Sequence, residues 1–154
     1  MAALVDTNVL VYRYDFRYPK KQRIAERFLR SGLALQMLRL PHQAIIEFVS
    51  VVTRPLPGAA SLLSRHEAYR EAEEMLNQFD ILYPTAEVVR IALRGAATYQ
   101  LSWFDAHLWA YAEFYGLPEL VSEDFTHGRI YGTVRAVNPF SPNSTVHESP
   151  ARSG

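Results

Sequence analysis

Short apolar runs alternate along this chain with longer segments whose apolar residues recur at helical spacing. The short runs predict buried strands, and the longer segments predict amphipathic helices between them. Strands are expected at residues 2–5, 33–40, 81–83, 119–122 and 133–137. Strands that alternate with helices are typical of crossover units, in which a mainly parallel sheet is covered on both faces. The pattern therefore predicts an α/β protein.

Residues that start or stop helices give the approximate ends of the helical segments. Pro19 opens one helix, in which Ile24 and Leu29 share the apolar face, and Gly32 is expected to close it. Further helices are expected at residues 9–12, 43–54, 65–79 and 85–99, and from Ser102 to the break at Gly116-Leu117-Pro118.

Length and composition are those of an ordinary globular domain. The chain has 154 residues, of which 49% are hydrophobic and 21% charged, and this is enough to bury one sizeable core. It has no cysteine, so neither disulfides nor thiolate metal sites are possible. We expect residues 1–140 to form one domain, and residues 141–154, rich in serine and proline, to form a mobile C-terminal tail.

The N-terminal segment and the lengths of the apolar runs indicate where in the cell the protein is expected. The first apolar run meets Asp6 too early for the apolar region of a signal peptide. No stretch approaches the roughly 18 apolar residues of a transmembrane helix. Together with the lack of cysteine, these features favour a cytoplasmic protein that does not enter a membrane.

The formal net charge is zero, from 16 basic and 16 acidic residues. A dedicated nucleic-acid binder usually carries a strong basic excess, so neutrality argues against tight, indiscriminate coating of nucleic acid. Neutrality is compatible with a nucleic-acid enzyme, because acidic site residues can cancel basic groups placed around them.

Carboxylates at four distant positions each interrupt an apolar segment: Asp6, Glu47, Asp105 and Asp124. A charge among core-forming residues is costly unless it is paired, hydrogen-bonded or bound to a metal. Because all four have the same sign, one shared site for a divalent cation would explain them together. A ligand set made only of oxygen selects hard cations, Mg²⁺ or Mn²⁺.

Each of these acids also has a local explanation. Asp6 lies between a strand and a helix, and helix capping by itself could explain its presence. Asp105 fits a capping box with Ser102. Glu47 could be a solvent-facing helix residue, and Asp124 a turn residue. Open parallel sheets, however, place ligand sites beyond the carboxyl ends of their strands, which is where Asp6 and Asp124 fall.

The motifs around these acids resemble the PIN domain, and within it the VapC-type toxins of toxin–antitoxin pairs. The resemblance covers roughly residues 2 to 140 and is carried, in order, by Val5-Asp6-Thr7-Asn8-Val9-Leu10, Glu47-Phe48, Phe104-Asp105-Ala106 and Leu120-Val121-Ser122-Glu123-Asp124-Phe125-Thr126-His127-Gly128. It implies a three-layer α/β/α sandwich around a mainly parallel five-stranded sheet, with a metal-dependent ribonuclease site at the strand ends. It also implies a cognate antitoxin partner and a possible homodimer.

The resemblance assigns roles residue by residue. The family's catalytic, metal-binding acids are matched by Asp6, Glu47, Asp105 and Asp124. Supporting polar positions are matched by Thr7, Asn8 and Ser122. Glu123 is an outer candidate only, because it lies beside Asp124 at the end of a strand.

We hypothesise that one or two Mg²⁺ or Mn²⁺ ions bind these acids and activate water to attack an RNA phosphodiester. This chemistry needs no side-chain nucleophile, and the sequence holds neither a serine-nucleophile motif nor a phosphate-binding loop. The densest basic segment could hold flanking phosphates and consists of Arg13, Arg17, Lys20, Lys21 and Arg23. A solvated helix face explains this segment at least as well.

Two other functions compete with this hypothesis. The first is a catalytically silent domain of the same fold that binds proteins, whose signature would be loss of the acids. The second is a magnesium-dependent phosphatase of doubly wound fold. That class typically has a second Asp two residues beyond the first, where this chain has Asn8.

Overall fold

The computed structural model describes residues 2–142, so residues 143–154 of the predicted tail lie outside the described residues. Its central sheet has the strand order β3-β2-β1-β4-β6-β5. The strands are β1 Ala3–Val5, β2 Leu38–Pro41, β3 Asp80–Leu82, β4 Glu119–Val121, β5 Ile130–Tyr131 and β6 Val134–Val137. All neighbouring pairs are parallel except β5 with β6. The predicted mainly parallel α/β fold is confirmed, with five parallel strands and one short antiparallel strand.

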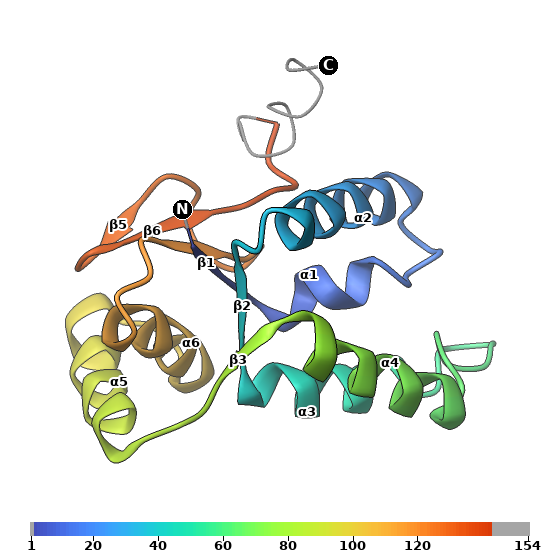
Figure 1. Ribbon diagram of the computed structural model, residues 1–154, viewed down its shortest axis with the longest axis horizontal. Coiled ribbons are helices and arrows are strands. Elements are labelled where there is room, and N and C mark those ends of the chain that lie inside the picture. The colour runs from blue at the N-terminus through green and yellow to red at the C-terminus, as the bar shows by residue number, and fades with distance from the viewer. Residues whose placement is uncertain (1, 143–154) are drawn as a thin grey trace.

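Helices cover both faces of this sheet (Figure 1). They are α1 Thr7–Tyr12, α2 Pro19–Ala34, α3 His42–Val52, α4 Arg65–Gln78, α5 Ala86–Tyr99 and α6 Trp103–Phe114. Val5 of β1 packs in a core cluster with residues of α1 to α4. Leu4, which points to the opposite face of the strand, packs with residues of α5 and α6. Burial on both faces is why β1 reads as a continuous apolar run.

The predicted end of α2 at Gly32 is wrong, because the helix continues to Ala34 and the backbone reverses at Gln36, with φ +55°. Gly32 allows close approach instead: a Cβ there would lie 2.6 Å from side-chain atoms of Leu38. The second strand therefore begins at Leu38 and not at residue 33.

The strand β5 was not predicted, because two residues are too short to show a pattern. It pairs with β6 across a tight turn in which Gly132 takes φ +64°, a conformation that glycine adopts without steric cost.

Adjacent parallel strands bring two distant segments to one edge of the sheet. Val5 at the end of β1 is in register with Val121 at the end of β4, and the Asp6 amide donates a 2.9 Å hydrogen bond to the Val121 carbonyl. Residues that follow β1 therefore lie beside residues that follow β4. None of the helices within residues 2–142 is long and apolar enough to cross a membrane.

Candidate active site

Asp6 lies at the end of β1 and caps α1, where its Oδ1 accepts a 2.6 Å hydrogen bond from the Thr7 amide. Its Oδ2 accepts a 2.7 Å bond from the hydroxyl of the buried Ser122. Burial raises the pKa of Asp6 to about 7, although these hydrogen bonds oppose the rise; repulsion from Asp124 and Glu47 adds to it. Capping therefore describes only one of the two oxygens, and the carboxyl group sits where its charge is unfavourable.

The Asn8 side chain bridges two of the predicted acids. Its Nδ2 donates to Asp6 Oδ2 at 3.3 Å and to Asp124 Oδ2 at 3.2 Å. Its Oδ1 is buried and has no hydrogen-bond partner among the described residues. Buried polar atoms are normally satisfied, so this carbonyl oxygen is available to a group that the protein itself does not supply.

Glu47 reaches the same place from α3, which packs on α1. Its Oε1 accepts a 3.0 Å hydrogen bond from Thr7 Oγ1. Adjacent residues of one short helix thus hold three acids, since Thr7 contacts Glu47 and Asn8 contacts Asp6 and Asp124.

Asp105 lies in the first turn of α6, where its amide donates a 3.2 Å hydrogen bond to Ser102 Oγ. Burial raises the pKa of Asp105, and the charge of Asp124 adds to the rise. Asp105 is therefore within electrostatic range of Asp124, but it does not line the cavity that contains the other three acids.

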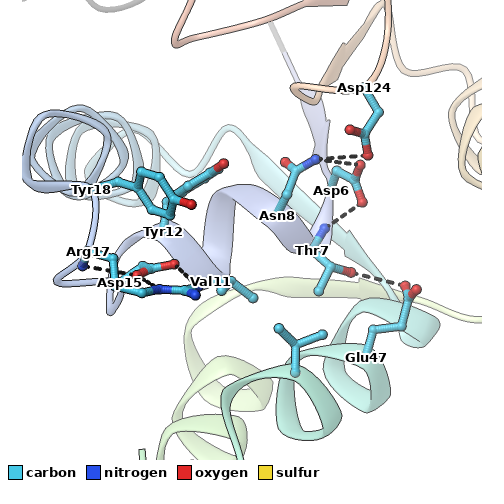
Figure 2. Close-up of a pocket in the computed structure, with 11 residues that line it drawn as sticks. Asp6, Thr7, Asn8, Val11, Tyr12, Asp15, Arg17, Tyr18, Glu47 and Asp124 are labelled. Atoms are coloured by element: carbon cyan, nitrogen blue, oxygen red, sulfur yellow. Dashed lines mark hydrogen bonds and ion pairs between the residues drawn. The ribbon is translucent and has the colours of Figure 1, made fainter. Parts of the chain in front are cut away.

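That cavity has a volume of about 370 Å³ and two sides of different character (Figure 2). One side carries the polar groups just described. The other side is formed by Tyr12, Asp15, Arg17 and Tyr18 from the end of α1 and the loop to α2. Tyr12, Asp15 and Tyr18 were not among the predicted site residues. The alternation of aromatic and charged residues over 14–18 is the signal that could have pointed to them.

Glu123 contacts a different group of side chains. It forms an ion pair with Lys21 and accepts a 2.7 Å hydrogen bond from the Tyr12 hydroxyl. This contact links the loop after β4 to α2 and α1.

The five basic residues of the predicted phosphate-binding segment have different partners in the structure. Arg13 pairs with Glu26 at 2.8 Å, and Lys21 pairs with Glu123. Lys20 and Arg23 are exposed on α2 and have no ion pair within the described part of the chain. Arg17 alone among these five lines the cavity.

The donor set suits a hard divalent cation, because carboxylate oxygens and a side-chain carbonyl oxygen are the ligands such ions prefer. Two further observations fit a cation site here: the unpaired buried Asn8 Oδ1 and the unfavourable charge on Asp6. The acids are nevertheless not gathered around a single point in the described part of the chain. Within residues 2–142, no three acidic or histidine side chains are placed closely enough to hold one ion together.

The chain belongs to the PIN domain family, whose profile matches residues 3–132. It is similar in structure to a chain of a toxin–antitoxin complex from Klebsiella pneumoniae, with 19% identity and a TM-score of 0.64, over 91% of this chain and 99% of that chain. It is also similar to a chain of VapBC2 from Rickettsia felis bound to a promoter DNA fragment, with 11% identity and a TM-score of 0.64, over 90% and 98%. At these identities the likeness shows the fold. No curated protein matches the sequence significantly.

Proposed function

We propose that this protein is an endoribonuclease that depends on Mg²⁺ or Mn²⁺ and acts as the toxin of a toxin–antitoxin pair. The observation that carries the proposal is the bridge from Asn8 to both Asp6 and Asp124 beside Glu47 in one open cavity. Membership of the PIN family supports it, since these domains are generally metal-dependent nucleases. Similarity to chains of two toxin–antitoxin complexes supports the biological role and an antitoxin partner.

In this proposal Asp6, Glu47, Asp105 and Asp124 provide the carboxylates that hold the cation. When bound, the cation supplies Lewis-acid activation of water and stabilises charge on the leaving oxygen of the phosphodiester. The Asn8 Nδ2 atom lies between Asp6 and Asp124 and donates a hydrogen bond to each. An N–H group carries a partial positive charge, so it does not bind a cation. The unpaired Oδ1 of Asn8 would be the atom through which this residue could help to hold a cation.

The remaining polar residues orient the acids. Ser122 donates to Asp6 and accepts a 3.0 Å hydrogen bond from the Asp124 amide, so it sets the spacing between two predicted ligands. Thr7 links Asp6 and Glu47 in a similar way, because its amide donates to Asp6 and its hydroxyl donates to Glu47. Mutation of a residue that supports a metal ligand in this way typically lowers metal affinity or activity by 10- to 100-fold.

The test compares three substrates in buffers with and without EDTA: labelled single-stranded RNA, the same sequence as DNA, and a phosphomonoester. We expect RNA cleavage that EDTA abolishes and that Mg²⁺ or Mn²⁺ restores. Asp6→Asn and Asp124→Asn should lose the activity while keeping the fold. Hydrolysis of the phosphomonoester alone would favour the phosphatase, and inactivity toward all three substrates in every metal would favour the silent binding module.

A further inference from the structure

The side of the cavity formed by Tyr12, Asp15, Arg17 and Tyr18 contains an arginine that the proposed metal chemistry does not use. Arg17 lies in the loop between α1 and α2, across the cavity from Asp124 and Glu47 (Figure 2). Its side chain is 43% exposed, so it remains accessible to a ligand. The protein holds this arginine in place more firmly than a typical surface side chain.

Asp15 fixes the orientation of Arg17. Asp15 is only 2% exposed and accepts hydrogen bonds from Arg17 Nε at 2.9 Å, Nη2 at 2.8 Å and the backbone amide at 3.1 Å. These bonds hold the pKa of Asp15 below its usual value. A fork of two parallel hydrogen bonds defines the plane of the guanidinium group. No acceptor within residues 2–142 takes a hydrogen bond from its Nη1 atom.

The charges of the cavity explain why an anion-binding group is needed there. Asp6, Glu47 and Asp124 form one side, and a polyanionic substrate is repelled by them wherever a bound cation does not offset their charge. Among the described residues that line this cavity, Arg17 is the only basic one. It is therefore the side chain of this cavity whose charge suits an anion.

The aromatic residues beside Arg17 indicate which kind of anionic ligand suits this side of the cavity. Tyr18 is 47% exposed, and the Arg17 guanidinium carbon lies 5.4 Å from its ring centroid. Tyr12 packs against Tyr18 edge to face, with centroids 5.8 Å apart. Basic side chains next to exposed aromatic rings are typical of sites for single-stranded nucleic acid, where bases are unstacked and can contact the rings. A cavity of about 370 Å³ has the size of a small-ligand site and not of a groove for a duplex.

We infer that Arg17, oriented by Asp15, binds a backbone phosphate of single-stranded RNA next to the scissile phosphate, with Tyr12 and Tyr18 forming the wall for that nucleotide. This inference rests on the proposed function, because it assumes that RNA is the substrate. It assigns to Arg17 alone a task that the sequence distributed over five basic residues.

The test measures cleavage of a labelled single-stranded RNA pool by the full chain with Mg²⁺, together with RNA binding by anisotropy in EDTA. Arg17→Gln should raise KM about tenfold and change kcat by less than threefold, because a charge-assisted phosphate contact is lost away from the reacting atoms. The slope of log Kd against log salt should fall by about 0.7, as expected for one contact to a single strand. Arg27→Gln removes the same charge from an exposed position on α2 that does not line the cavity, and it should change neither quantity.

Two further variants separate orientation from charge. Asp15→Asn makes the chain more positive, so an effect of charge alone would lower both Kd and KM for RNA. If the fork from Asp15 orients Arg17, as we infer, its loss should instead raise KM. Arg17→Lys keeps the charge without the fork and should recover only part of the affinity; it also covers the case in which Asp15→Asn fails to fold, as judged by circular dichroism. An active protein in which Arg17→Gln leaves KM and the salt slope unchanged would overturn this inference alone. Failure of the unaltered chain to cleave RNA with Mg²⁺ or Mn²⁺ would overturn the proposed function as well.

Discussion

Ser122 Oγ donates a 2.7 Å hydrogen bond to Asp6 Oδ2 across two neighbouring parallel strands. The two residues are 116 positions apart in the chain, yet this contact fixes how the Asp6 carboxyl group is presented. It also stabilises the charged form of Asp6 and so lowers its pKa against the effect of burial.

Ser122→Ala should therefore weaken binding of Mg²⁺ or Mn²⁺ to the proposed site. Without the hydroxyl, the pKa of Asp6 rises further and the free carboxylate needed by a metal becomes scarcer near neutral pH. We expect a loss of about tenfold in metal affinity, measured by calorimetric titration and by the metal dependence of Tm. Ser50→Ala, on the exposed side of α3, serves as the control. Equal metal affinities in both variants would contradict the proposed role of Ser122.

The metal-free protein should lose stability as pH rises from about 4 to 8, to the extent that Asp6 is responsible. Its pKa is about 7 in the folded protein against 3.8 as the ordinary value, so the folded state binds the proton more tightly. The resulting stability is fully present below pH 4 and is lost as pH rises through 7. We expect on the order of 1–3 kcal/mol between these limits. Urea unfolding in EDTA at several pH values should show this loss in the unaltered chain and not in Asp6→Asn.

Asn8→Asp should make the protein depend more strongly on divalent cations. The substitution replaces the amide that bridges Asp6 and Asp124 with another negative charge. In EDTA at neutral pH we expect destabilisation of about 1–3 kcal/mol, from the lost hydrogen bonds and added repulsion. Mg²⁺ should then raise Tm more than it does in the unaltered chain. Asn77→Asp, exposed on α4, adds the same charge elsewhere, and an identical response to Mg²⁺ in both variants would contradict the model of the site.

Gly95→Ala should destabilise the fold, although alanine normally strengthens a helix. Gly95 is buried inside α5, and a Cβ at this position would overlap the Trp109 indole of α6. Overpacking of this kind usually costs about 1–3 kcal/mol, more than the roughly 1 kcal/mol gained in helix propensity. Thr98→Ala, exposed on the same helix, should have the opposite sign or little effect. Urea unfolding measures both, and a gain in stability for Gly95→Ala would show that the two helices can separate without cost.

Much of the fold could be predicted because its signals are local. The buried strands β1 and β4 show as short apolar runs, and Ser64 and Ser102 cap helices at the predicted starts. The errors arose where long-range packing decides. Gly32 resembles a helix end in the sequence, but in the fold it makes room for Leu38.

The sequence by itself determined the alternation of strands and helices and the position of each acid within an apolar segment. Tertiary structure decided which side chains share a cavity. The contacts of Asp6 with Ser122, of Asn8 with Asp124 and of Thr7 with Glu47 join residues 40 to 116 positions apart, so no local pattern encodes them. Packing likewise gave Arg17 its place in the cavity and paired Arg13 with Glu26 and Lys21 with Glu123. Such partners depend on strand register and helix packing, which the chain acquires only when its core assembles.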